Sequence, residues 1–128
     1  MTYVNDPIGD LLTRIRNAQS VRRTGCRAPW SRIKQELCEL MVREGWLQKV
    51  EVKGEEPKLE LDLTFVPGKK LLLERVSKPG RRVYSMSADL KPVLRGYGQA
   101  ILTTSQGLLT DGQARKKKVG GEVLCTIA

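Results

Sequence analysis

The chain has 128 residues, a mass of 14.4 kDa and a formal net charge of +9, from 23 Lys+Arg against 14 Asp+Glu. Its 40% hydrophobic and 29% charged residues are typical of a globular protein and argue against disorder or a collagen-like chain. We expect no membrane span, because no run of about 18 apolar residues occurs, and no signal peptide within residues 1–10.

The first predicted helix begins at Pro7, with Asp6 as its N-cap, and fades near Ser20. Its apolar residues recur at the i, i+3, i+4 and i+7 spacing of a single helix face: Ile8, Leu11, Leu12 and Ile15. A basic, turn-prone stretch at 22–25 follows, and residues 26–28 are expected to be extended.

A second helix is predicted from its N-cap, Ser31, to Gly45, which ends it. Segments 47–52 and 59–65 predict two strands that the turn 54–57 joins into a hairpin. Residues 1–65 are therefore expected to form an N-terminal α/β lobe of the helix–strand–helix–hairpin type. Residues 66–70, which contain Pro67 and Gly68, predict a hinge.

The remaining residues, 66–128, predict a mostly β C-terminal lobe. Its expected strands are 71–76, 83–85, 100–104 and 122–127, with turns at 77–80 and 105–107. One short helix is expected after Asp89, carrying Leu90, Val93 and Leu94, and another helical turn begins at Thr110-Asp111. The predicted fold class is α+β, with the N-terminal lobe packed on the mostly β lobe.

Basic charge is concentrated in the second half of the chain. Residues 1–65 hold 11 basic and 10 acidic side chains, whereas residues 66–128 hold 12 basic and 4 acidic ones. A polyanion partner fits this asymmetry, because cations that neutralise phosphates release condensed counterions. A generally basic, solvated surface is the plainer alternative.

Groups suited to catalysis or metal binding are scarce. The sequence contains no histidine, and its three cysteines, Cys26, Cys38 and Cys125, form no CxxC pair. The nearest acidic pairs lie at a predicted helix start and in a turn, where capping and solvation explain them. We therefore expect a non-enzymatic protein of a reducing cytoplasm, with no metal, no cofactor and no small-molecule substrate.

Residues 103–107, here called the hydroxyl loop, are the first candidate binding site: Thr103, Thr104, Ser105, Gln106 and Gly107. Hydroxyl groups both donate and accept hydrogen bonds, so they can read base edges and the 2′-hydroxyl of RNA. A glycine lets the backbone approach a ligand closely. An ordinary strand-to-turn transition is the plainer alternative.

Two basic clusters are further candidates. Lys78, Arg81 and Arg82 surround a predicted turn next to Tyr84, so cations could hold phosphates while the ring contacts a sugar or base. Tyr84 could equally be a core residue with its hydroxyl at the surface. The run 115–118, which includes Arg115 and Lys116, fits either binding or a solvated face.

Four segments of the sequence can be compared, in chain order, with the signatures of known families: DPIGDLLTRIRNA at 6–18, RVSKPGRRVY at 75–84, TTSQGLLTD at 103–111 and GGEVLC at 120–125. Together they resemble the signatures of the bacterial small-subunit ribosomal protein eight family. This resemblance implies a constituent of the small ribosomal subunit, located in the cytoplasm. It further implies early binding to the central domain of small-subunit ribosomal RNA, help in folding that domain, and neighbouring ribosomal proteins as partners.

The resemblance also implies which residues bind RNA. The loop usually reads Ser-Thr-Ser-Lys-Gly in the family, so Thr103 keeps the hydroxyl and Gln106 replaces the lysine. Further positions that match RNA-contacting family positions are Tyr84, Gly121, Glu122, Asp6, Pro7, Arg14 and Asn17. The last four would touch a second RNA segment. A basic protein–protein scaffold or a nucleoid-type DNA-binding protein remains the rival, although the predicted basic helical turns are short for a major groove.

Overall fold

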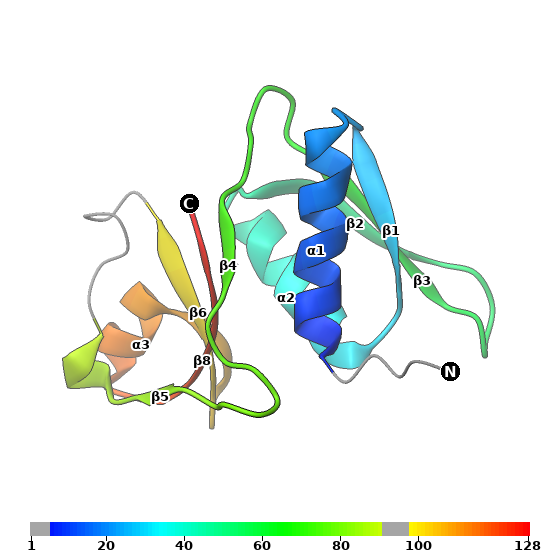
Figure 1. The fold of residues 1–128 in the computed structure, drawn as a ribbon. Helices are drawn as coiled ribbons and strands as arrows, with labels where there is room; N and C mark the ends of the chain where they lie inside the picture. Colours follow the sequence, from blue (N-terminus) through cyan, green and yellow to red (C-terminus); the bar gives the residue numbers. More distant parts are fainter. Residues whose placement is uncertain (1–5, 91–97) are drawn as a thin grey trace. The chain divides into compact units, whose positions relative to one another are not determined.

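The computed structural model describes residues 6–90 and 98–128 (Figure 1). These residues form two compact units, which divide between Leu71 and Leu72. The elements of the first unit are α1 (Pro7–Ser20), β1 (Gly25–Pro29), α2 (Arg32–Arg43), β2 (Leu47–Lys53) and β3 (Glu60–Phe65). The elements of the second are β4 (Leu73–Arg75), β5 (Tyr84–Ser85), the 3₁₀ helix η1 (Ser87–Asp89), β6 (Gln99–Thr104), β7 (Gly107–Thr110), α3 (Asp111–Lys117) and β8 (Gly121–Ile127). Helices and antiparallel sheets occur in both units, so the predicted α+β class is confirmed.

A three-stranded antiparallel sheet, in the order β1-β3-β2, forms the first unit together with α1 and α2. The predicted hairpin of β2 and β3 is confirmed, and β1 pairs with the other edge of β3. Every second residue of β3 is buried, namely Leu61, Leu63 and Phe65, as its alternating sequence predicts. Helix α1 contacts β1, α2 contacts β2, and the two helices contact each other.

The N-termini of the two long helices are capped differently. The Ser31 hydroxyl accepts a hydrogen bond from the Lys34 backbone N–H at 3.3 Å, so its predicted role as N-cap is confirmed. Asp6 occupies the N-cap position of α1, and Pro7 begins the helix as predicted. The Asp6 carboxylate makes no capping hydrogen bond, and it lies against Gly9 instead.

The three α-helices within the described residues end in the same type of turn. A left-handed residue lies two positions beyond the last residue of α1 and of α2, and directly after the last residue of α3: Arg22 has φ +58°, Gly45 +84° and Lys118 +55°. Each of these residues donates its N–H to the carbonyl three residues back, and the following residue donates to the carbonyl five residues back. This is the Schellman motif, in which the left-handed position is usually glycine. Arg22 and Lys118 carry a Cβ there, at a cost of about 1–2 kcal/mol each.

A five-stranded sheet forms the second unit. Strand β6 lies between β7 and β8, and β4 and β5 both pair with the other edge of β8. Helix α3 contacts β6 and β7. The predicted strands at 100–104 and 122–127 are confirmed, and β4 is shorter than the predicted 71–76. Strand β7 was not predicted. The β6–β7 hairpin that carries the hydroxyl loop was therefore not predicted either.

The predicted cap at Asp89 is wrong. Asp89 ends the 3₁₀ helix η1, and Leu90 has extended dihedral angles, φ −73° and ψ +125°, so no helix begins at that residue. The later part of that predicted helix, with Val93 and Leu94, lies outside the described residues.

Two of the cysteines are core residues. Cys38 in α2 and Cys125 in β8 are 0% exposed, and burial raises the pKa of each thiol from 9.0 to about 12. The folded protein therefore keeps both thiols protonated at a pH where the unfolded chain has released the protons. The stabilising contribution is complete below about pH 9 and is lost as the pH rises toward about 12.

We expect the free energy of unfolding to fall above about pH 9, by up to about 1.4 kcal/mol per pH unit for each of these two thiols. Urea unfolding at a series of pH values measures this slope. Cys38→Ala costs stability at every pH because it leaves a cavity, yet its slope should be smaller than that of the unchanged chain. Identical slopes in the two proteins would contradict the assignment of the pH dependence to the buried thiol.

Candidate nucleic-acid interface

The hydroxyl loop is the turn of the β6–β7 hairpin. The Thr104 hydroxyl donates to the Gly107 carbonyl at 2.9 Å and accepts from the Gln106 N–H at 3.1 Å, and Gly107 has φ +97°. The Thr104 hydroxyl, which was predicted to contact RNA, therefore makes hydrogen bonds within the turn and holds its shape. Ser105 and Gln106 are exposed at its tip, with their side chains available to a ligand.

Three strands bring the other predicted residues to the base of this loop. Glu122 in β8 pairs with Thr103 in β6 on one side and with Tyr84 in β5 on the other. Directly paired residues of neighbouring strands project from the same face of a sheet. Tyr84, Glu122 and Thr103 are 38 positions apart at most in the sequence, and the sheet places them in one row.

Gly121 allows this close packing. An added Cβ would lie 3.0 Å from the Thr103 carbonyl carbon and 3.2 Å from Thr104 Cα, and closer still to the Thr103 carbonyl oxygen. These are backbone atoms, which cannot turn aside as a flexible side chain can. A glycine is therefore required where β8 meets the base of the hydroxyl loop.

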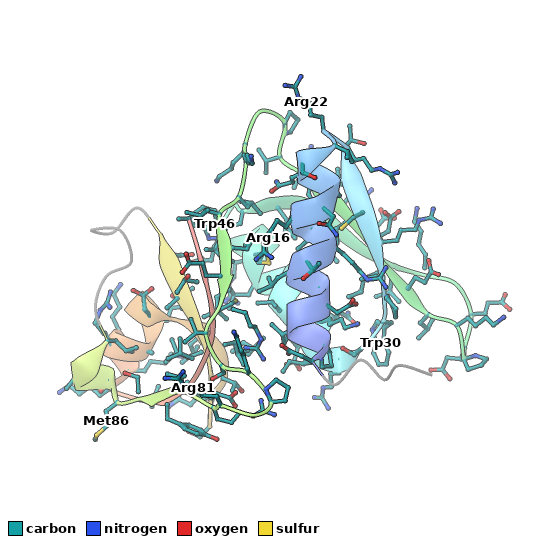
Figure 2. All side chains as sticks on the ribbon, viewed as in Figure 1. Arg16, Arg22, Trp30, Trp46, Arg81 and Met86 are labelled. Atoms are coloured by element: carbon teal, nitrogen blue, oxygen red, sulfur yellow. The ribbon has the colours of Figure 1, made fainter. Side chains whose placement is uncertain are left out.

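Tyr84 is 70% exposed, which contradicts the alternative of a core tyrosine. Met86 is 72% exposed, and its side chain projects away from the ribbon in Figure 2. A hollow of about 510 Å³ lies beside these two residues, and Lys118, Gly120 and Gly121 also line it. Sequence reasoning missed Met86, because an apolar residue beside a predicted strand reads as core.

The turn 77–82 is held by a buried hydroxyl. Ser77 is 0% exposed, and its Oγ accepts from the Val83 N–H at 2.8 Å and donates to the Val83 carbonyl at 3.1 Å. Across the turn, the Lys78 and Arg81 backbones pair with each other. Both side chains are exposed, so this turn presents two cations beside Tyr84.

Two arginines of the predicted clusters are held by carboxylates. The Arg82 guanidinium lies 3.1 Å from Glu122 Oε2, and Arg115 lies 3.1 Å from Oδ2 of the buried Asp111. A cation paired in this way is less available to a phosphate. Lys116 and Lys117 are exposed at the end of α3, so they are the stronger candidates in that run.

The predicted residues of the first unit lie along α1. Arg14 and Asn17 are exposed near one another, whereas Asp6 and Pro7 lie about three turns from Asn17 along the helix. Arg14 Nε lies 2.9 Å from Asp10 Oδ2, and its Nη1 donates to the Arg27 carbonyl at 3.5 Å. The structure therefore separates this set into two pairs.

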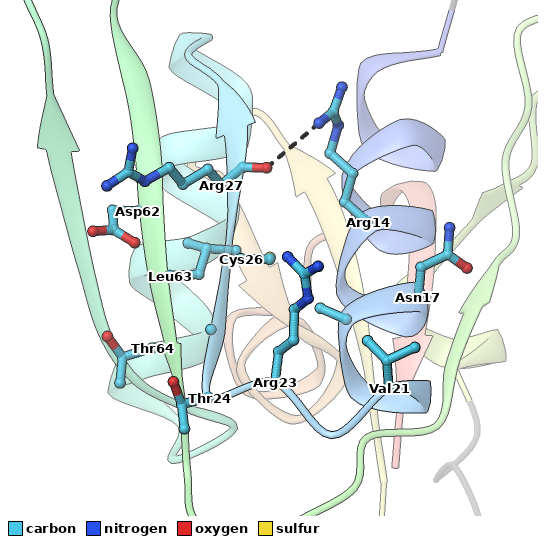
Figure 3. A pocket seen from close by; sticks show the side chains of 12 residues that line it. Arg14, Asn17, Val21, Arg23, Thr24, Cys26, Arg27, Asp62, Leu63 and Thr64 are labelled. Carbon is cyan, nitrogen blue, oxygen red and sulfur yellow. Dashed lines mark hydrogen bonds between the residues drawn. The ribbon is translucent and has the colours of Figure 1, made fainter.

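Figure 3 shows a hollow of about 750 Å³ lined by Arg14 and Asn17 together with residues of β1 and β3. Arg23 extends into it in this view, and Cys26 lies on its wall. Burial raises the pKa of the Cys26 thiol to about 11, although the Arg14 charge acts in the opposite direction. The thiol is therefore protonated near neutral pH and is a poor nucleophile.

Neither a metal centre nor a membrane span is found in the described part of the chain. No group of three or more His, Cys, Asp or Glu side chains within residues 6–90 and 98–128 is placed to hold a metal ion. Over the same residues, no helix combines the length and the apolar character needed to cross a bilayer.

Comparison with known proteins identifies the family. The family model described as Ribosomal protein S8 matches residues 6–128. Small ribosomal subunit protein uS8 of Rhodopirellula baltica is 48% identical over 132 residues, which cover 98% of this chain and 99% of that protein. The proteins of the same name from Thiobacillus denitrificans and Rubrobacter xylanophilus are each 46% identical over 129 residues, with 98% and 97% of this chain covered and 98% of each relative. The chain therefore belongs to the ribosomal protein S8 family and is a non-enzymatic component of the small ribosomal subunit, as its four sequence signatures predict.

Proposed function

We propose that the second unit binds a structured helical segment in the central domain of small-subunit ribosomal RNA and helps that domain to fold during subunit assembly. The observation that carries this proposal is the row of Tyr84, Glu122 and Thr103 at the base of the hydroxyl loop. Tyr84 is exposed in this row, Ser105 is exposed at the tip of the loop, and the turn that precedes Tyr84 carries the exposed Lys78 and Arg81. This combination suits RNA, whose recognition relies on stacking, the 2′-hydroxyl and irregular shape.

The cations and the polar side chains of the hydroxyl loop have different roles in binding. Cations of the turn 77–82 and of the end of α3 contact phosphates and set the position of the protein on the RNA. Ser105 and Gln106, at the tip of the hydroxyl loop, contact sugars or base edges and select the shape of the site. Gln106 stands where the family usually has a lysine, so this loop contributes hydrogen bonds in place of a phosphate contact.

Arg14 and Asn17 of the first unit are proposed to touch a second RNA segment, and neighbouring ribosomal proteins are proposed as further partners. A DNA-binding role is not favoured, because α3, the basic helix of the described chain, has only seven residues. The polar hydroxyl loop likewise lacks the apolar anchors that protein–protein hot spots use. RNA therefore fits the surface better than either rival partner.

Ser105→Ala should weaken binding to the cognate RNA helix by about two- to tenfold, which is the value of one or two lost hydrogen bonds. It should leave binding to a regular duplex unchanged. Lys117→Ala should weaken binding to both RNAs by the same factor. It should also reduce the slope of log affinity against log salt concentration by the equivalent of about one phosphate contact. Titrations of both variants and of the unchanged chain against both RNAs, over a range of salt concentrations, measure these effects.

Equal losses for Ser105→Ala on the two RNAs would contradict a shape-reading role for the loop. Failure of the unchanged chain to bind either RNA at low ionic strength would contradict the proposed function as a whole. Retention of a protein partner after nuclease treatment, without RNA affinity, would favour the scaffold alternative.

A further inference from the structure

A second basic hollow lies in the first unit, beyond the C-terminus of α1. It has a volume of about 790 Å³, and four cations line it: Arg22, Arg23, Lys69 and Lys70. Its other lining groups are hydroxyls, amides and apolar side chains, and none of its described lining residues is acidic. We call these lining residues the α1-end hollow. A site with four cations and no carboxylate is suited to a polyanion.

The wall of this hollow is held in place by named contacts. The Gln19 side chain donates to the Lys69 carbonyl at 3.4 Å and accepts from the Leu71 N–H at 3.1 Å. Lys69 Nζ donates to the Gly45 carbonyl at 3.0 Å and lies 4.5 Å from the centre of the Trp46 ring. The segment predicted as a hinge is therefore tied to α1 and to the residues that follow α2, and Lys69 is occupied by these contacts.

Arg22 holds its place at a steric cost. It occupies the left-handed position of the Schellman motif, where α2 has Gly45, and its side chain projects beyond the end of α1 (Figure 2). A cation near a helix C-terminus is favourable, but any position in the last turn would supply it without strain, and the last turn of α1 has no basic residue. Strained positions of this kind cluster at functional sites. The strain indicates that the charge is needed at this point.

We propose that the α1-end hollow binds backbone phosphates of a further RNA strand through Arg22 and Lys70, with Arg23 at the border that it shares with the hollow of Figure 3. This inference rests on the proposed RNA-binding function and adds a contact outside the residues assigned to it above. Ser20, Thr24 and Gln48 offer hydroxyl and amide groups to the sugar–phosphate backbone. The contact is independent of base sequence, because the single aromatic side chain of the hollow, Phe65, is only 6% exposed and offers no stacking face.

RNA fits this hollow better than an acidic protein segment does. Protein–protein hot spots depend on exposed aromatic anchors, which the lining residues lack. Two of its four cations are arginines, whose planar fork matches a phosphate with two parallel hydrogen bonds. The chain is also a component of the small ribosomal subunit, in which RNA is the abundant polyanion.

Arg22→Gly is the decisive variant, because it removes the charge and relieves the left-handed strain together. We expect its urea midpoint to be equal to or higher than that of the unchanged chain. Binding to a transcript of the whole central domain should weaken by about three- to tenfold at moderate salt. The slope of log affinity against log salt concentration should fall by the equivalent of about one phosphate contact. The double variant Arg22→Gly, Lys70→Gln should reduce the slope of log affinity against log salt concentration by the equivalent of about two phosphate contacts.

The control variant is Arg32→Gln, which removes one positive charge from α2. The Arg32 side chain is 88% exposed and pairs with Glu36, and it does not line the hollow. It should leave affinity for the whole-domain transcript almost unchanged. A minimal RNA helix that carries only the site of the second unit should bind the unchanged chain, Arg22→Gly and Arg32→Gln equally well.

The outcomes separate this inference from the proposed function. If Arg22→Gly loses no more affinity than Arg32→Gln, or loses as much on the minimal helix as on the whole domain, the hollow is not a separate RNA contact. If the variant binds both RNAs normally but no longer retains an acidic ribosomal protein, the occupant is protein and the inference is overturned. If the unchanged chain does not bind the minimal helix, the proposed function itself fails.

Discussion

Gly121→Ala should lower the free energy of unfolding by about 2–3 kcal/mol and reduce affinity for the cognate RNA helix by more than tenfold. The added methyl group would meet the backbone of Thr103 and Thr104, so β6 and β8 must separate where they now pair. That separation moves the base of the hydroxyl loop away from Glu122 and Tyr84. Urea unfolding and RNA titration, each on the purified full chain, measure the two losses.

Gly112→Ala is the matched control. Gly112 lies within α3, and an added Cβ would meet only the Arg115 guanidinium, at 4.0 Å. Alanine is the better helix former, so this variant should be as stable as the unchanged chain or more stable by up to about 1 kcal/mol. A stable Gly121→Ala protein with normal RNA affinity would show that the two strands can part at this point without cost.

Ser77→Ala should cost about 2 kcal/mol, because it leaves the Val83 N–H without its acceptor, whereas the Val83 carbonyl keeps its hydrogen bond from the Val123 N–H at 2.9 Å. The Ser77 side chain is 0% exposed, so water cannot readily replace the lost hydroxyl. RNA affinity should fall as well, because the turn that presents Lys78 and Arg81 begins at this residue. Thermal unfolding and RNA titration measure the two effects.

Ser85→Ala is the control variant for Ser77→Ala. The Ser85 hydroxyl donates only to the adjacent Met86 carbonyl, at 3.2 Å, in a half-buried position. Its loss should change the free energy of unfolding by less than about 0.5 kcal/mol. If Ser77→Ala behaves like Ser85→Ala, the buried hydroxyl does not organise the turn.

Local periodicity made the elements of the first unit predictable. The apolar spacing of α1, the Ser31 cap of α2 and the alternation of β3 each lie within a short stretch of sequence. The pairing of β1 with β3 could not be predicted, because strand partners distant in sequence leave no local signal. Strand β7 was missed for another reason: Gly107 and two adjacent leucines read as the end of a turn.

The candidate site was predictable in its chemistry and much less so in its geometry. Charge asymmetry, the hydroxyl loop and Tyr84 beside a basic turn are visible in the sequence, and family resemblance added Gly121 and Glu122. The αL conformation of Arg22 was not visible, since nothing in a run of two arginines marks one of them as left-handed. Occupation of the Thr104 hydroxyl within its own turn likewise depends on the hairpin, which only the fold defines.

Strand β8 has a consequence for how the protein is made. It lies between β6 on one side and β4 and β5 on the other, yet a translating ribosome produces it after all of them. Until β8 emerges from the exit tunnel, the nascent chain has no strand to join Tyr84 to Thr103. The proposed RNA surface is thus assembled only at the end of synthesis, when the last strand can insert between its neighbours.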